Sequence, residues 1–323
     1  MPIPDSIRFY TYFPLLIPSI PCSIFILYHL LTKRTLRQAL NNHVIILILI
    51  LGLVYELTDV IWLMHYYRVG ISLFQIPTFC LIWVFIDVGI FATITILVAW
   101  ASIQRHILIF HDKWVSTKRG RLLFHYIPSF LFLVYPIIFY VYIFIIMDCE
   151  EPFDYEIIRC GYSFCALYDP IIGTFDSILH NIIPTFIIVT FSFLLLVRVL
   201  WQKHRLRQRI QWRNYRKMVI QLLSIASIYL FCYFPAMIVY LMFESNVSVS
   251  DSAFDYYFSS LFFIPHIIMV IPFATIFSLP ELQKKLKINI LFWKRPVHAV
   301  APRTIRMNRT GNAQIAVITQ TVK

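Results

Sequence analysis

The chain has 323 residues, of which 59% are hydrophobic and only 14% are charged, and its formal net charge is +12. Its mean hydropathy of +0.74 exceeds what a soluble domain of this length could bury, which excludes a water-soluble globular protein. The composition instead indicates an integral membrane protein.

Seven mostly apolar windows follow one another along the chain. Each has about 20 residues or more, which is long enough to cross a bilayer as a helix. None shows the two-residue alternation of a membrane β-barrel strand. We place the windows at residues 9–31, 44–63, 78–102, 122–147, 178–200, 219–243 and 254–279. The sequence thus predicts an all-α membrane protein, a seven-transmembrane helix bundle over residues 9–279 after a short N-terminus, residues 1–8.

The basic residues predict how the helices are oriented. All but Arg8, Arg68 and Arg159 of the 28 Lys and Arg residues follow the first, third, fifth or seventh window. Because cytoplasmic loops carry the excess of Lys and Arg, we expect an extracellular N-terminus and a cytoplasmic C-terminus in the plasma membrane. The net charge then reflects topology and contact with the lipid bilayer, and we expect no nucleic acid as a partner.

Acidic residues inside the second and third windows are the first candidate site residues. Glu56 and Asp59 are three residues apart and share one face of a helix, where an acid usually faces a cavity or a partner. A structural pairing and a ligand contact explain them equally well. Asp87 and Arg105 are 18 residues apart in the third window, which is five helical turns, so both should point the same way.

A long acidic loop, residues 148–176, is predicted between the fourth and fifth helices. Cysteines Cys149, Cys160 and Cys165 of this loop and Cys80 of the third helix lie on the predicted outer side, where disulfides form. Four cysteines allow three connectivities. We favour a bond from Cys80 to the loop, taken as Cys80–Cys165, which leaves Cys149 and Cys160 as a second pair. The loop then forms a disulfide-tethered lid.

The sixth window contains aromatic residues before a proline in the middle of the membrane. Tyr233 and Phe234 precede Pro235, which frees a backbone carbonyl and predicts a hinge. Asn246, in the sequence Asn-Val-Ser, is a predicted glycosylation site on the outer side.

An amphipathic helix is expected after the seventh window, over residues 280–293. Its apolar positions Leu282, Leu286, Ile290 and Trp293 fall on one face, which is typical of a helix on the inner membrane surface. Residues 294–323 are polar, and we expect them to form a disordered cytoplasmic tail.

Together these features resemble the rhodopsin-like family of G-protein-coupled receptors over residues 9–293. Cys80 stands where the family has its disulfide cysteine, and Gln104-Arg105-His106 stands where the family has its Asp/Glu-Arg-Tyr motif. The resemblance implies that Arg105, flanked by Gln104 and His106, contacts a heterotrimeric G protein after activation. Gln104 replaces the acid that normally pairs with this arginine, which implies raised basal activity.

Other positions depart from the family pattern. Tyr233 replaces the tryptophan of the helix-six motif Cys-Trp-x-Pro, and Ile271 and Thr275 replace the asparagine and tyrosine of Asn-Pro-x-x-Tyr. Gly52 stands where the family has a sodium-binding aspartate. The resemblance is therefore to a divergent member.

The ligand is the least specified part of the prediction. Asp87 occupies the position at which amine receptors of the family hold an ammonium group. The acidic outer loop, together with Glu56, Asp59 and Asp87, fits a basic or amidated peptide better than an amine, and a purely structural acid is the third alternative. Expected ligand contacts are Asp87, Glu56, Asp59, Tyr233 and Phe234.

Two other classes are weighed against the receptor. One is a seven-helix chemosensory receptor or channel that does not couple to G proteins; the other is a transporter, although no internal repeat is visible. No nucleophile with a base and no metal-ligand cluster stands out, because His125 and His180 look isolated. We therefore expect neither an enzyme nor a cofactor or metal.

Overall fold

The computed structural model describes residues 4–147, 153–161, 169–206, 223–244, 256–257, 259–279, 282–283 and 285. The chain divides into two compact units, Met1–Gln283 and Lys284–Lys323, and the predicted bundle falls within the first. The predicted glycosylation site Asn246, both Cys149 and Cys165, and the tail lie outside the described residues, as does nearly all of the predicted helix 280–293.

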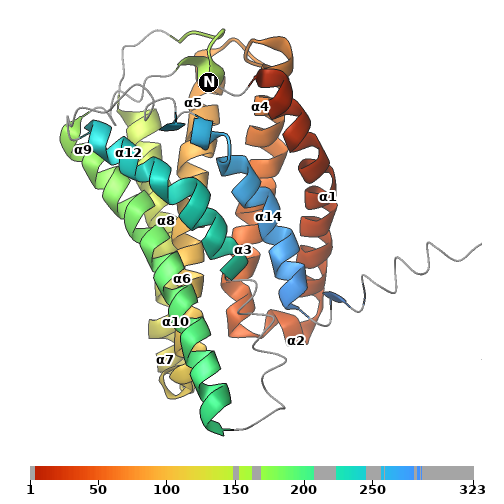
Figure 1. Cartoon of the computed structure of the whole chain (residues 1–323), viewed down its shortest axis with the longest axis vertical. Helices are drawn as coiled ribbons and strands as arrows, with labels where there is room; N and C mark the ends of the chain where they lie inside the picture. The colour runs from red at the N-terminus through yellow and green to blue at the C-terminus, as the bar shows by residue number, and fades with distance from the viewer. Residues whose placement is uncertain are drawn as a thin grey trace, which may run out of the picture. The chain divides into compact units, whose positions relative to one another are not determined.

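Within the described residues, seven helices are long and apolar enough to cross a membrane, and each overlaps one predicted window. Their bounds are Asp5–Thr32, Leu40–Val69, Pro77–Phe110, Lys118–Ile146, Ile171–Arg198, Leu223–Met242 and Ser259–Ser278. Every regular element in the described part of the chain is helical. The predicted seven-helix architecture is thus confirmed at the level of an all-α bundle, whose helices run side by side (Figure 1).

Most spanning helices consist of more than one element. The first is α1 (Asp5–Thr32), and the short α2 (Arg34–Arg37) follows it. The second comprises α3 (Leu40–Tyr55) and α4 (Ile61–Val69), the third α5 (Pro77–Val84) and α6 (Phe91–Phe110), and the fourth α7 (Lys118–Arg121) and α8 (Ile127–Val141). The fifth comprises α9 (Pro170–Asp176) and α10 (Ile183–Leu206), while α12 (Phe234–Glu244) and α14 (Ile264–Ser278) belong to the sixth and seventh.

π-helical turns join these elements within a spanning helix. In the described residues they cover Glu56–Val60, Phe85–Ile90, Leu122–Tyr126, Tyr142–Ile146, Ser177–Ile182 and Tyr229–Tyr233. A π turn inserts one residue into the helical repeat, and such turns are frequent at functional sites. All of them except Tyr142–Ile146 carry side chains that belong to buried polar clusters of the bundle.

The third spanning helix lies at the centre of the bundle. Of its most apolar window 78% is buried, compared with 28% for the fourth helix. Its inner part, α6, packs against α3, α8 and α10. At Gly89 the third and fourth helices approach so closely that an added Cβ atom would lie 2.9 Å from Cβ of Tyr140. Tyr140 in turn belongs to the apolar core cluster with Val84, Ala92, Ile143 and Phe144.

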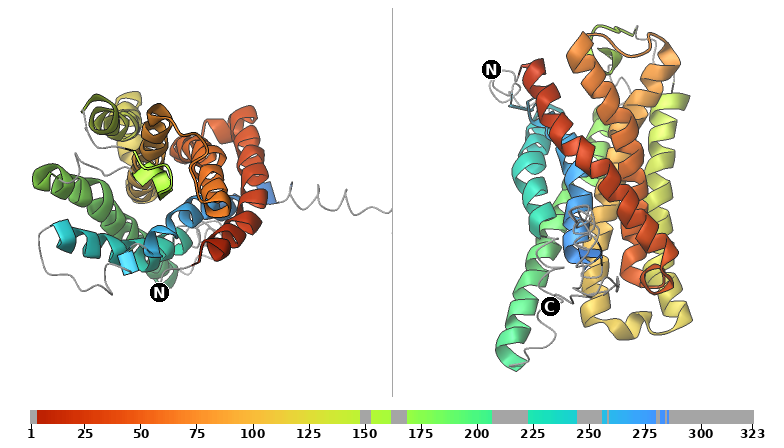
Figure 2. Two further views of the ribbon diagram at one scale, coloured as in Figure 1. Left: turned by 90° about the horizontal axis from the view of Figure 1, so that it is seen from above. Right: turned by 90° about the vertical axis from the view of Figure 1, so that its right-hand side faces the viewer.

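One end of the bundle is closed by two loops, and we call it the outer end after the predicted topology. The loop before α5 and the loop 153–161 meet there, and the amide of Ser72 donates to the carbonyl of Tyr155 at 2.9 Å. The turn 158–161 packs on α5 and lies over the bundle when it is seen from above (Figure 2, left). The opposite end, where α2 and α7 lie, is called the inner end.

The predicted lid, residues 148–176, is shorter than the sequence suggested. Helix α9 begins at Pro170, and the side chain of Asp169 accepts hydrogen bonds from the amides of Ile171 and Ile172. An aspartate cap followed by proline at the first helical position is a standard helix start, because the cap satisfies free amides and proline lacks one. The last seven residues of the predicted loop are therefore helix.

Candidate functional site

Two of the predicted acids lie next to each other in facing π-helical turns. Asp59, in the turn Glu56–Val60, is fully buried, and Asp87, in the turn Phe85–Ile90, is 6% exposed. The indole Nε1 of Trp83 donates to Oδ1 of Asp59 at 2.9 Å, and the hydroxyl of Tyr55 donates to Oδ1 of Asp87 at 3.3 Å. The second and third helices thus share one buried acidic site.

The cation in this acidic site comes from the chain itself. Arg159 of the outer loop places Nε 2.5 Å from Oδ2 of Asp87 and Nη2 2.9 Å from Oδ1. Burial alone lowers the pKa of Arg159, but the carboxylates of Asp87 and Asp59 outweigh it, so the pKa lies above its ordinary value. A guanidinium that engages both carboxylate oxygens is the strongest form of this contact. Asp87 is therefore already paired with a cation of the chain itself in this structure.

A disulfide holds the loop that carries Arg159. The partner of Cys80 is Cys160, with Cα atoms 5.8 Å apart, and not Cys165 as the sequence-based pairing has it. A pair between Cys149 and Cys160 is excluded by the same bond. Cys80 and Asp87 are seven residues apart and so share a face of the third helix. The neighbouring residues Cys160 and Arg159 can therefore reach them together, Cys160 bonding to Cys80 and Arg159 pairing with Asp87. The spacing of cysteines in the sequence carries no signal for this choice.

Backbone geometry places these two side chains. Arg159 and Cys160 have φ values of 56° and 59°, and Gly161 has 58°. Such left-handed conformations are disfavoured for residues with a Cβ atom, so surrounding contacts must maintain them. The ion pair to Asp87 and the disulfide to Cys80 supply those contacts.

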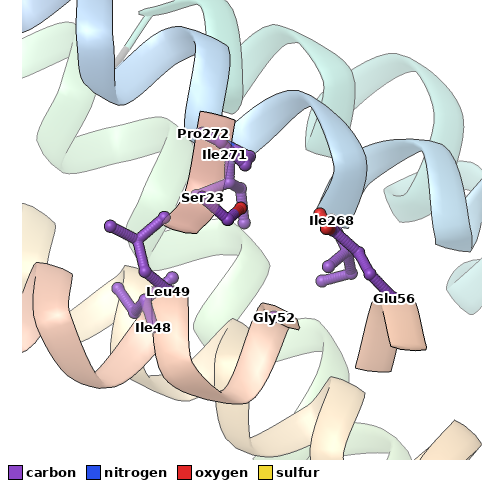
Figure 3. Close-up of a pocket in the computed structure, with 8 residues that line it drawn as sticks. All are labelled: Ser23, Ile48, Leu49, Gly52, Glu56, Ile268, Ile271 and Pro272. Atoms are coloured by element: carbon purple, nitrogen blue, oxygen red, sulfur yellow. The ribbon is translucent and has the colours of Figure 1, made fainter. Parts of the chain in front are cut away.

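Glu56 makes its contacts elsewhere, between the first, second and seventh helices. Oγ of Ser19 lies 2.6 Å from Oε1 of Glu56 and 3.0 Å from the carbonyl oxygen of Met269. Oγ of Ser19 is the donor in both contacts, and its single proton is shared between the two acceptor oxygens. Glu56 lines a narrow space with Ser23, Ile48, Leu49, Gly52, Ile268, Ile271 and Pro272 (Figure 3). The space has no room for a water molecule, which argues against a ligand there.

Tyr233 belongs to a second polar cluster that the sequence reasoning missed. Its hydroxyl donates to Oδ1 of Asn181, and its ring meets Phe91 edge-on at 5.1 Å. In the same cluster, Oδ1 of Asp176 accepts from the hydroxyl of Tyr140 at 2.5 Å and from Nδ1 of His180 at 2.8 Å.

The signal for this cluster is present in the sequence. Asp176 and His180 are four residues apart and share one helix face, but the sequence-based prediction places Asp176 in the loop and treats His180 as isolated. Phe234 and Pro235 are half-buried and begin α12 directly after the π turn Tyr229–Tyr233.

Three successive side chains at the inner end of α6 contact three different parts of the bundle. Nε2 of Gln104 contacts Nδ1 of His125 on the fourth helix, and Nε2 of His106 donates to the carbonyl of Phe191 on the fifth at 3.0 Å. Arg105, 5% exposed, lines a space with Ile45, Ile48, Val98, Ala101, Ile225, Ile271 and Thr275. Successive helical residues point about 100° apart, which explains the three directions.

His125 is thus not isolated, but central to a chain of hydrogen bonds. Its Nε2 lies 2.9 Å from Nδ1 of His43, and Nε2 of His43 donates to the carbonyl of Arg37 at 2.8 Å. The chain runs from Gln104 on the third helix through the fourth and second helices to α2. It fixes the inner end of the third helix against its neighbours.

Replacing His125 by Phe should destabilise the protein, because the buried amide of Gln104 and the half-buried imidazole of His43 lose their shared partner. Each such group costs about 1–3 kcal/mol. We expect the apparent Tm of the purified full chain to fall by about 4–10 °C in a thermal-shift measurement. The control is His111→Phe, an exposed ring stacked on Trp114 at 4.7 Å, which should change little. Equal melting temperatures for the two variants would contradict a stabilising role for this chain of hydrogen bonds.

A roomier hollow than the spaces beside Glu56 and Arg105 lies at the outer end. It measures about 420 Å³ and is lined by Ile71, Gln75, Phe153, Asp154, Tyr155 and Glu156. Two of these side chains are carboxylates, and both are exposed. Within the described residues, no group of three or more His, Cys, Asp or Glu side chains could hold a metal ion.

No protein-family model matches the chain, and no curated protein sequence matches it.

Proposed function

We propose that this chain is a G-protein-coupled receptor in the plasma membrane that binds an extracellular ligand and activates a heterotrimeric G protein. The observation that supports it best is the buried third spanning helix. It is bonded to an outer loop at Cys80 and carries the buried Gln104-Arg105-His106 sequence at its inner end. One rigid element therefore joins a face that a ligand can reach to a face that a cytoplasmic partner can reach.

We assign the coupling role to Arg105. Its surroundings include Ile225 of the sixth helix and Ile271 of the seventh. Removing a guanidinium from water has a desolvation cost, and a movement that exposes Arg105 to water or to a partner reduces that cost. Outward movement of the inner half of the sixth helix would expose Arg105 to a G protein.

The sixth helix has a suitable hinge. The π turn Tyr229–Tyr233 is followed by Pro235 in the first turn of α12, so two breaks in the regular hydrogen-bond pattern coincide. Tyr229 and Tyr233, which contact Thr95 and Asn181, anchor this hinge to the third and fifth helices. A change in either contact at the outer half would be passed to the inner half.

A basic peptide is the ligand class that we favour over a small amine. Asp87 already forms an ion pair with Arg159, so an amine could bind Asp87 only by displacing the guanidinium of Arg159. The outer hollow, by contrast, presents Asp154 and Glu156 beside the aromatic rings of Phe153 and Tyr155. Carboxylates next to aromatic faces suit Lys or Arg side chains of a peptide.

Replacing Arg105 by Ala should abolish signalling. The measurement begins with a screen of basic and amidated peptides in cells that coexpress a promiscuous G protein, which identifies an activating ligand. We expect the maximal response to that ligand to fall at least about 10-fold in Arg105→Ala, as for loss of one strong contact. The matched control is Arg119→Ala, an exposed arginine of α7, which should retain the response. An N-terminal epitope tag, read on intact cells, checks that both variants reach the surface with the N-terminus outside.

A response that survives in Arg105→Ala at equal surface expression would contradict the coupling role. A response that also survives in cells without heterotrimeric G proteins would identify a channel or transporter instead. A tag that is accessible only after permeabilisation would reverse the proposed orientation.

A further inference from the structure

The acidic site between the second and third helices contains two carboxyl groups and one guanidinium group. Asp59 and Asp87 are both buried, and Arg159 is the cation that the described residues place against them. Oδ2 of Asp59 is buried and has no hydrogen-bond partner among the described residues. An unpaired buried carboxyl oxygen is costly, so the site retains unused capacity for a hydrogen-bond donor or a cation.

The shape of the site matches a planar guanidinium group. Nη2 of Arg159 donates to Oδ1 of Asp87 at 2.9 Å, and Nε lies 2.5 Å from Oδ2 as an ion-pair contact. Tyr55 donates to the same carboxylate at 3.3 Å. A planar guanidinium places two nitrogens against the two oxygens of one carboxylate, whereas an ammonium group binds as a single point charge.

The guanidinium enters this site from outside the bundle. Arg159 belongs to the outer loop, and its side chain is 14% exposed, so the site connects to the outer surface rather than lying sealed between helices. The neighbouring disulfide from Cys160 to Cys80 holds the loop independently of the ion pair. The loop can therefore stay in place when the arginine side chain is removed.

We propose that Asp59 and Asp87 form a guanidinium-binding site, which the chain fills with its own Arg159 and which accepts a free alkylguanidinium ion when that side chain is absent. This site is independent of G-protein coupling. A ligand that carries an arginine-like group enters it only by exchange with Arg159. Arg159 is thus a tethered occupant of a binding site.

The test removes the tethered group and supplies it again in solution. Arg159→Ala deletes the two methylenes and the guanidinium beyond Cβ, and the ethylguanidinium ion has these same atoms. We expect the apparent Tm of the purified full chain to fall by roughly 5–10 °C in this variant, as for other broken buried ion pairs. Millimolar ethylguanidinium chloride should restore at least half of the loss, and ethylammonium chloride at the same concentration much less.

Two controls separate binding at the site from general effects of the salt. Arg68→Ala removes an exposed arginine at the outer end, and neither the substitution nor the added ion should shift its Tm. In Arg159→Ala with Asp87→Asn, ethylguanidinium should restore much less of the loss, because only Asp59 of the two carboxyl groups remains. Recovery of equal size in that double variant would overturn the proposal, as would an unchanged Tm of Arg159→Ala.

If Arg159→Ala does not yield purified protein, two further measurements test the proposal. Arg159→Lys retains the charge and most of the volume but not the planar guanidinium, so we expect a smaller loss of Tm. If ethylguanidinium in the growth medium raises surface expression of Arg159→Ala but not that of the double variant, the site is supported. If it raises neither, the proposal is overturned.

Discussion

Replacement of Asp87 by Asn is expected to destabilise the protein by about 3–5 kcal/mol. The substitution removes the negative charge but leaves Arg159 buried, and an uncompensated buried charge is the most costly outcome of breaking such a pair. Because Asp59 remains near the guanidinium of Arg159, we expect the loss of unfolding free energy to lie at the lower end of this range. The measurement is thermal unfolding of the purified full chain, where the loss appears as a lower apparent Tm.

A double-mutant cycle shows whether the loss comes from the pair. In Asp87→Asn with Arg159→Gln both charges are gone, and we expect the double variant to be more stable than Asp87→Asn alone. The control is Asp5→Asn, an exposed acid on α1 whose side chain is 62% exposed and lies 4.0 Å from Arg8, and it should change stability by less than about 0.5 kcal/mol. Strictly additive single effects would show that Asp87 and Arg159 are not coupled.

Loss of the disulfide is expected to have a similarly large effect. The bond joins residues 80 positions apart, and a cross-link of this span is worth about 4 kcal/mol through the restricted unfolded chain. Cys160→Ser should therefore melt well below the unaltered protein. A reducing agent should lower the Tm of the unaltered protein but should shift that of Cys160→Ser much less.

Cys165→Ser is the discriminating comparison, because the sequence-based pairing joins Cys80 to Cys165. With Cys80 bonded to Cys160, this variant should retain the disulfide and most of the stability. Peptide mapping without reduction should recover a cross-linked fragment that contains Cys80 and Cys160. A fragment that joins Cys80 to Cys165 instead would refute the pairing seen in the structure.

The seven helices could be predicted from the sequence because they depend on length and polarity alone. About 20 apolar residues in a row leave few alternatives to a spanning helix. The predicted helix ends are less accurate where capping side chains and prolines determine at which residue a helix begins. Asp169 and Pro170 fall in the predicted loop, although an acidic cap followed by proline is also the start of a helix.

The partners of the buried polar groups could be predicted only in part. Asp87 and Arg159 are 72 residues apart, and nothing local in either stretch indicates that the loop turns inward. That turn depends on the left-handed conformation of Arg159 and Cys160, which their side chains do not favour. The pairing of Asp176 with His180, in contrast, follows from a spacing of four residues once the helix is recognised.

The contact at Gly89 has a mechanical consequence. Because nothing larger than hydrogen fits between its Cα atom and Tyr140, the third and fourth helices have a fixed separation at that level. Relative movement is then a tilt about this fulcrum. Arg105 lies roughly 24 Å from it along the helix and Cys80 roughly 14 Å, at 1.5 Å per residue. If the helix tilted as a rigid body about this contact, Arg105 would move farther than Cys80, because Arg105 lies farther from the contact.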